Sequence, residues 1–222
     1  MRYEEWDVYY RQILEDFGYS REEDERSARL LDETLAGTRI DPEDLRELFG
    51  GKEATIAGNA ERLVDELAAV THPLVAADEA TSVLRARGIR PDVIVTDLDG
   101  IVEDQIAANR DGAVAVIHAH GNNIPAVERW APKFTGRVLA TTQSRPFGRV
   151  HNFGGFTDGD RAAFLADHFG ATNLLLLGFD FENPSPKDTD RATKKRKLDW
   201  AYILIQTLDD SVYDQNKTQS AD

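Results

Sequence analysis

The stretch PDVIVTDLDG, residues 91–100, contains a short apolar run followed by two aspartates on either side of one leucine. The β-branched residues 93–95 follow a turn at Gly88 and predict a buried parallel strand. Side chains alternate along an extended chain, so Asp97 and Asp99 are expected to point to the same side. Paired carboxylates repel each other, and a hard divalent cation between them is the usual solution. The alternative is that one aspartate caps the next helix and the other is solvated.

Five further apolar segments predict strands, and helical patterns separate them. These segments are residues 54–57, 73–77, 113–117, 137–142 and 174–177. Strands that alternate with helices predict an α/β fold with a doubly wound, mostly parallel sheet. Residues 2–49 show helical spacing instead and predict an N-terminal helical appendage. We therefore expect a helical extension over residues 1–51, an α/β catalytic domain over 52–209 and a polar, disordered tail over 210–222.

Polar residues follow nearly every predicted strand. They are Gly58-Asn59, Asp78-Glu79, Asp97 with Asp99, His118 with His120, Thr141-Thr142-Gln143 and Asp180. The carboxyl ends of parallel strands meet at one rim of the sheet, where ligands of open α/β folds bind. This convergence favours an active site over a purely structural set.

The composition excludes several classes of protein. There is no cysteine among the 222 residues, which excludes disulfides and thiolate metal sites. The net charge of −14 disfavours nucleic-acid binding. The absence of a long apolar run and the charged sequence MRYEEWDVYY at the start predict a cytoplasmic protein without a membrane segment. The excess of aspartate and the scarcity of lysine favour a halophile surface, with an ordinary acidic cytosolic protein as the alternative.

Three further segments carry groups that could bind anions or metals. The basic run 194–197, KKRK, opens a predicted helix, where positive charge opposes the helix dipole unless an anion such as a nucleoside triphosphate binds. A solvated face is the alternative. A glycine-rich loop before Asp158 and Asp160 leads into another helix, where free N–H groups could bind an anion or the aspartates could act as caps. His118 and His120 could bind zinc with a carboxylate, contact phosphate, act as acid or base, or be fixed by backbone bonds.

The usual nucleotide-binding motifs are absent from the sequence. It has neither a GxxxxGK[ST] loop nor a GxGxxG turn before a helix. A nucleotide would therefore be held through a metal and scattered basic groups.

Four motifs together resemble the archaeal 6-hydroxymethyl-7,8-dihydropterin diphosphokinase family (MptE-like), which is itself similar to thiamine pyrophosphokinases. They are PDVIVTDLDG, HAHGNN at 118–123, GGFTDGDRA at 154–162 and KKRKLDWA at 194–201. The resemblance spans residues 54–205, and the chain has Asn122 where the motif more often has aspartate.

The resemblance implies ATP-dependent transfer of diphosphate to the hydroxymethyl oxygen of the pterin, with Mg²⁺ as cofactor and release of AMP. The implied roles are Asp97, Asp99 and His120 in catalysis, Asp97 and Asp99 as metal ligands, Asn59, Asn123, Lys194, Arg196 and Lys197 in ATP binding, and Asp78 and Asp180 in pterin binding. The implied partners are small-molecule substrates, with no nucleic acid and no membrane. A homodimer is compatible with the resemblance. Two alternatives stay open. One is diphosphoryl transfer to thiamine or another acceptor, and the other is a non-catalytic nucleotide sensor whose N-terminal helices contact a partner protein.

Overall fold

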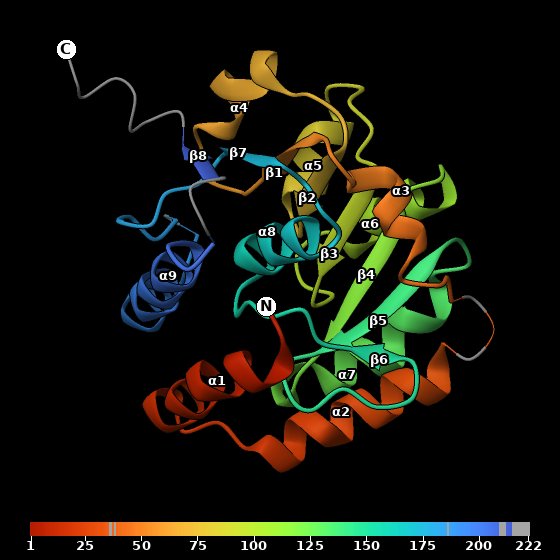
Figure 1. The fold of residues 1–222 in the computed structure, drawn as a ribbon, viewed down its shortest axis with the longest axis vertical. Coiled ribbons are helices and arrows are strands. Elements are labelled where there is room, and N and C mark those ends of the chain that lie inside the picture. The colour runs from red at the N-terminus through yellow and green to blue at the C-terminus, as the bar shows by residue number, and fades with distance from the viewer. Residues whose placement is uncertain (36, 38, 186, 209–211, 215–222) are drawn as a thin grey trace.

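The computed structural model describes residues 1–35, 37, 39–185, 187–208 and 212–214, and it contains one eight-stranded sheet with the order β6-β5-β4-β3-β2-β1-β7-β8 (Figure 1). All seven pairs of neighbouring strands are parallel. The strands are β1 (Glu53–Ala57), β2 (Leu74–Ala77), β3 (Val93–Thr96), β4 (Val114–Ala119), β5 (Val138–Thr142), β6 (Val150–His151), β7 (Asn173–Leu177) and β8 (Val212–Asp214). The predicted fold class is confirmed.

Two strands were not predicted. β6 has only two residues, which is too short for an alternating pattern to be visible in the sequence. β8 lies within the stretch expected to be a polar, disordered tail, and it pairs with β7 from Leu174 to Leu176. Residues 210, 211 and 215–222 of that expected tail lie outside the described residues.

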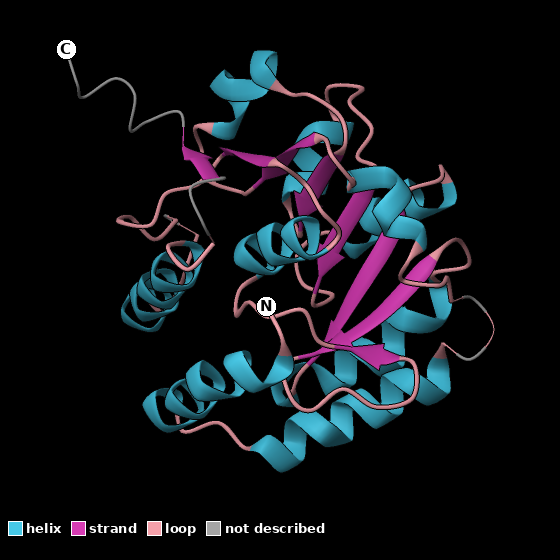
Figure 2. Cartoon of the chain, viewed as in Figure 1, coloured by secondary structure: helices cyan, strands magenta, loops and turns pink. Residues whose placement is uncertain are grey.

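Helices cover both faces of the sheet, as the prediction of a doubly wound fold requires (Figure 2). One face packs against α1 (Tyr3–Phe17), α3 (Asp44–Phe49), α8 (Asp158–His168) and α9 (Arg191–Ile205). The other packs against α2 (Arg21–Thr34), α4 (Leu63–Glu66), α5 (Ala80–Arg85), α6 (Val102–Arg110) and α7 (Ile124–Trp130). The 3₁₀ turns are η1 (Leu67–Ala69), η2 (Gly121–Asn123) and η3 (Ala131–Lys133).

The N-terminal helices share their core with the sheet. Trp6, Tyr10 and Ile13 of α1 are fully buried and belong to the same apolar cluster as Val95 of β3 and Val116 of β4. On the opposite face, Leu31 of α2 packs in a cluster with residues of β4 and β5. The aromatic stripe of α1 is therefore core, and the helices stand close to the carboxyl ends of the strands.

The order in which strands are added to the sheet switches sides at β1, although all strands stay parallel. Strands β1 to β6 add to the sheet in chain order on one side, and β7 then pairs with β1 on the other side. Ligands of open α/β sheets bind outside such a switch point. The backbone is close-packed there, because a Cβ atom on Gly58 would lie 2.6 Å from the carbonyl oxygen of Gly178. Only a residue without a side chain lets these two strand ends approach each other so closely.

Candidate active site

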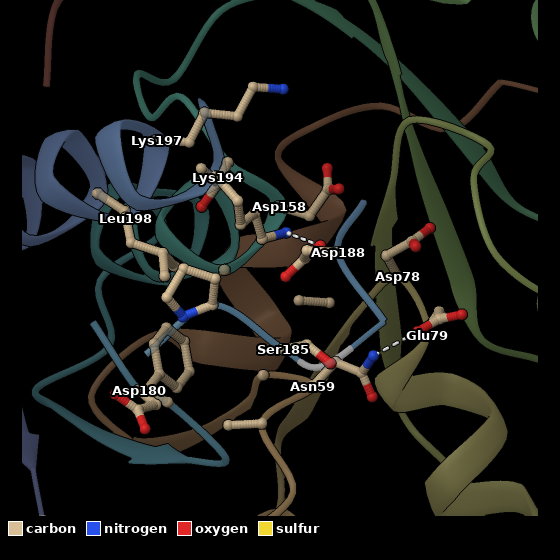
Figure 3. A pocket seen from close by; sticks show the side chains of 18 of the residues that line it. Asn59, Asp78, Glu79, Asp158, Asp180, Ser185, Asp188, Lys194, Lys197 and Leu198 are labelled. Atoms are coloured by element: carbon tan, nitrogen blue, oxygen red, sulfur yellow. Dashed lines mark hydrogen bonds and ion pairs between the residues drawn. The ribbon is translucent and has the colours of Figure 1, made fainter. Parts of the chain in front are cut away.

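A pocket of about 820 Å³ lies at the carboxyl ends of the parallel strands. Loops after β1, β2, β3, β4 and β7 form its walls together with α8 and α9 (Figure 3). Eight of the predicted site residues line it: Asn59, Asp78, Asp97, Asp99, His120, Asp180, Lys194 and Lys197. Two do not, Asn123 and Arg196. The rim predicted from the strand ends is therefore present.

Three carboxylates gather in this pocket. Asp78 follows β2, Asp97 follows β3 and Asp158 opens α8, and one oxygen of each lies within 4.8 Å of the others. Burial raises the pKa of Asp158 to about 7, and repulsion from Asp97 adds to the effect. Burial, with repulsion from Asp158 and Asp97, also raises the pKa of Asp78 well above its usual range. A cluster of hard oxygen donors with excess negative charge fits a divalent cation such as Mg²⁺.

Asp97 differs from its two neighbours in the cluster, because His120 donates to it. The Nδ1 atom of His120 accepts from the backbone N–H of Asn122 (3.3 Å), so Nε2 carries the proton and donates to Asp97 Oδ2 (3.2 Å). Burial pushes the pKa of Asp97 upward, but the hydrogen bond from His120, followed by the nearby cations Arg161 and Lys197, holds it down at about 2. Asp97 is therefore the permanently charged member of the cluster.

Asp99 lies outside the three-carboxylate cluster. The expectation that it points the same way as Asp97 assumed an extended chain, but β3 ends at Thr96 and Leu98 has φ of +68°. This left-handed residue breaks the alternation. Asp99 is exposed on the pocket wall, where its Oδ1 accepts from the backbone N–H of Gly100 (2.7 Å). Asp78 also has positive φ, at +45°, and strained backbone of this kind is concentrated at functional sites.

Asn123 acts behind the pocket rather than in it. Its side-chain amide donates to the backbone oxygens of Asp97 (2.8 Å) and His118 (2.7 Å) and accepts from the backbone N–H of His120 (3.0 Å). Asn123 therefore joins the ends of β3 and β4. Burial lowers the pKa of His118 well below its usual range, so its ring is neutral. Among the described residues, neither His118 nor His120 joins a metal-type cluster, and the zinc interpretation is not supported.

The basic run at the start of α9 divides between two faces of the helix. Lys194 and Lys197 line the pocket, with Lys194 Nζ 3.8 Å from Asp188 (Figure 3). Arg196 faces away, where it pairs with Asp16 (2.7 Å) and lies over the ring of Phe17. Residues three apart share a helix face, whereas residues one or two apart do not.

Asp158 of the three-carboxylate cluster and its partner Arg161 were missed as ligand-binding groups in the sequence. Asp158 and Asp160 were both open to interpretation as helix caps, but Asp160 does the capping by accepting from the backbone N–H groups of Phe156 (2.6 Å) and Thr157 (2.7 Å). Asp158 is thereby left to face the pocket. Arg161 is 7% exposed and donates to Asp158 (3.1 Å), and its buried Nε has no hydrogen-bond partner among the described residues. The sequence did contain a signal: the start of this helix has two aspartates, and one is enough to cap it.

The remaining predicted residues lie on the β1 and β7 side of the pocket. Asn59 donates to the carboxylate of Glu79 (Figure 3). Asp180 accepts from the backbone N–H groups of Glu182 and Asn183, both at 2.9 Å, so it also stabilises the turn after β7. Hydrogen bonds thus occupy part of each side chain.

No helix among the described residues is long and apolar enough to cross a lipid bilayer. Comparison of the fold with solved structures gives a chain of the MAf glycosyltransferase from Magnetospirillum magneticum AMB-1, with a TM-score of 0.47 and 16% identity, covering 82% of this chain and 35% of the other.

Comparison of the sequence gives close relatives. The chain is 42% identical to the 6-hydroxymethyl-7,8-dihydropterin pyrophosphokinase of Methanothermobacter thermautotrophicus, covering 94% of this chain and 96% of the relative. It is 41% identical to the protein of the same name from Pyrococcus furiosus, covering 94% of each. For the one from Methanocaldococcus jannaschii the identity is 35%, covering 96% of this chain and 98% of the relative. Residues 30–185 match the family described as 6-hydroxymethylpterin diphosphokinase MptE-like. The resemblance carried by the four motifs is confirmed, and the chain belongs to the MptE-like 6-hydroxymethylpterin diphosphokinase family.

Proposed function

We propose that the protein transfers the terminal diphosphate of ATP to the hydroxymethyl oxygen of 6-hydroxymethyl-7,8-dihydropterin, which supplies a cofactor pathway of the methanopterin type. The pterin oxygen forms a bond to the β-phosphorus of ATP, the bond from that phosphorus to the oxygen bridging the α-phosphate breaks, and AMP and a proton leave. The observation that carries this proposal is the three-carboxylate cluster in the same pocket as the cations Lys194, Lys197 and Arg161.

The two sets of charges divide the work of binding a polyphosphate. Asp78, Asp97 and Asp158 would hold Mg²⁺, which supplies charge neutralisation at phosphate oxygens when it is bound. Lys194 and Lys197 provide cations from α9 in the same pocket. Phosphoryl transfer depends mainly on such positioning and charge stabilisation, with little covalent chemistry for the protein to perform.

The remaining residues position groups rather than react. His120 keeps Asp97 oriented and ionised, and Asn123 fixes the loops on which Asp97 and His120 stand. Asp99 would approach the metal and phosphates from the pocket wall. For the pterin ring, which presents several N–H donors, we propose the β1 and β7 side of the pocket, where Asn59 and Asp180 provide polar groups and Phe179 an aromatic face.

The test is to incubate the protein with ATP, Mg²⁺ and the reduced hydroxymethylpterin and to measure AMP and pterin diphosphate. We expect AMP in equal amount to pterin diphosphate, and none with thiamine in place of the pterin. AMP formation with thiamine alone would move the activity to another acceptor. Tight ATP binding without AMP for either acceptor would contradict a catalytic role and favour a nucleotide sensor.

A further inference from the structure

Helix α2 carries one buried carboxylate, Asp24, which contacts residues behind the active-site pocket. Asp24 is only 2% exposed, yet it accepts hydrogen bonds from three different elements. The hydroxyl of Tyr10 on α1 donates at 2.6 Å, Gln143 Nε2 after β5 at 2.8 Å, and the backbone N–H of Gly121 after β4 at 2.7 Å. A buried carboxylate that accepts from this many donors is strongly fixed in position.

The contact with Asp24 decides which way the amide of Gln143 faces. A carboxylate accepts only, so it selects the NH₂ end of the amide. The Oε1 end then faces Arg161 and accepts from its guanidinium at 3.3 Å. The same guanidinium donates to Asp158, a member of the three-carboxylate cluster, at 3.1 Å. A continuous chain of hydrogen bonds therefore runs from Asp24 to the cluster.

The next turn of α2 provides a second chain. Ser27 Oγ donates to Asn123 Oδ1 at 3.1 Å, and Asn123 in turn donates to the backbone oxygen of Asp97. The helix is tightly docked on this loop, because a Cβ atom on Gly121 would lie 2.7 Å from Cβ of Glu23. In Figure 1, α2 lies beside α7, which begins where this loop ends. Helix α2 thus contacts the supports of both Asp97 and Asp158.

We propose that α2 is a positioning element of the metal cluster, in which Asp24 sets the orientation of the Gln143 amide and Gln143 holds Arg161 against Asp158. This inference rests on the proposed function only in taking the cluster as the metal site. It gives the N-terminal helices a role in the reaction through residues that never touch the substrate.

The substitution Asp24→Asn separates this role from simple packing. The backbone N–H of Gly121 cannot turn and keeps the remaining oxygen as its acceptor, so the new NH₂ group faces Gln143 Nε2. The amide of Gln143 must then turn over to avoid two donors in contact. Its NH₂ end then faces Arg161, and the hydrogen bond that holds the guanidinium is lost. Direct partners of metal ligands typically change metal affinity or activity by about 10–100-fold when they are replaced, and because Asp24 acts through Gln143 and Arg161 we expect Asp24→Asn to weaken Mn²⁺ binding by about 10-fold, the lower end of that range.

A charge exchange provides the rescue. In the double variant Asp24→Asn, Gln143→Glu the new amide can donate to the carboxylate at 143, and that carboxylate can accept from Arg161. The chain of hydrogen bonds is restored, and the negative charge moves from position 24 to position 143. Gln143→Glu alone places two carboxylates in contact and is expected to be impaired. We expect the double variant to bind Mn²⁺ more tightly than either single variant.

Mn²⁺ binding is measured by electron paramagnetic resonance of the free ion, without ATP or pterin, alongside thermal unfolding and kcat and KM for diphosphate transfer. Two matched controls are available. Glu22→Gln makes the same carboxylate-to-amide change at an exposed position of α2 and should leave Mn²⁺ affinity unchanged. Tyr10→Phe removes another donor to Asp24 and should lower the unfolding temperature while Mn²⁺ affinity stays the same.

Each outcome decides the inference. Normal Mn²⁺ affinity in Asp24→Asn overturns it while the proposed function stands. Equal losses in Tyr10→Phe and Asp24→Asn, or a double variant no better than its parents, show general loosening and also overturn it. If Asp24→Asn does not fold, Gln143→Ala breaks the same chain at its middle and must show the loss. A wild-type protein that binds no Mn²⁺ refutes the metal cluster and this inference with it, whereas Mn²⁺ binding without AMP formation refutes the proposed function alone.

Discussion

At the scale of single residues, Asp97 and Asp99 are expected to differ in importance although the sequence presents them as a pair. Asp97 belongs to the three-carboxylate cluster and is held by His120, whereas Asp99 is exposed on the pocket wall. Replacing even a partner of a metal ligand costs about 10–100-fold, so we expect Asp97→Asn to lower kcat by more than about 100-fold. Asp99→Asn should lower it less. Steady-state AMP production measures both, and near-normal turnover in Asp97→Asn would contradict the metal role.

The raised pKa values in the cluster predict how stability depends on pH in metal-free protein. A carboxylate whose pKa rises to about 7 on folding, as for Asp158, keeps its proton in the folded state over a range where the unfolded state has lost it. The free energy of unfolding then falls as pH rises from about 4, the pKa of aspartate in the unfolded chain, toward 7. The loss is up to about 1.4 kcal/mol per pH unit for each such group. Thermal unfolding in EDTA should occur at a lower temperature at pH 7.5 than at pH 5.5.

Two controls isolate this effect from the general charge of the protein. Asp158→Asn should reduce the pH dependence in EDTA, and saturating Mg²⁺ should raise the unfolding temperature of the wild type more at pH 7.5 than at pH 5.5. Asp97 does not contribute in this window, because its low pKa of about 2 places its own stability change below pH 4. An unchanged pH dependence in Asp158→Asn would show that the cluster is not its source.

At the scale of elements, we expect the two faces of α9 to differ in their effect on ATP binding. Lys194 and Lys197 line the pocket, and charge-assisted hydrogen bonds of the kind that phosphate accepts are worth about 1.5–3 kcal/mol each. We expect Lys197→Gln to raise the KM for ATP by about 10–100-fold. The matched control is Arg196→Gln, which removes a contact with Asp16 on α1 and should leave this KM unchanged. Equal effects of the two variants on KM would indicate that the basic run attracts ATP through its total positive charge and not through contacts of single side chains.

The same helix shows where prediction from sequence reaches its limit. Of the basic run at 194–197, Lys194 and Lys197 line the pocket, but adjacency in sequence grouped Arg196 with residues that the 3.6-residue period places on another face. At the end of β3 the error was similar, since the alternation that pairs Asp97 with Asp99 stops where Leu98 adopts positive φ. Asp158 joins the cluster only because α8 brings its start beside β2 and β3, and no local pattern encodes that approach.

At the scale of the whole molecule, the arrangement of strands was the most predictable feature. Apolar runs separated by helices are determined by burial and chain geometry, so the parallel sheet and the rim that gathers its strand ends followed from the sequence. The long-range packing of α1 and α2 did not. Their apolar residues identified them as helices with a buried face, but not that Asp24 contacts Gly121 and Gln143, nearly a hundred residues or more away in sequence.

The excess of acidic residues predicts that salt stabilises the whole molecule. A net charge of −14 places many like charges on one surface, and raising the ionic strength shortens the range of their repulsion from about 10 Å at 0.1 M to about 3 Å at 1 M. We expect the unfolding temperature at pH 7.5 to rise between 0.1 and 1 M KCl, by about 2–4 °C for each kcal/mol gained. The matched control is the same measurement near pH 5, close to the isoelectric point of about 4.8, where the repulsion is small and the salt effect should largely vanish. An equal rise at both pH values would mean that KCl acts through apolar burial instead of through charge, and the acidic surface would then have no role in tolerance of salt.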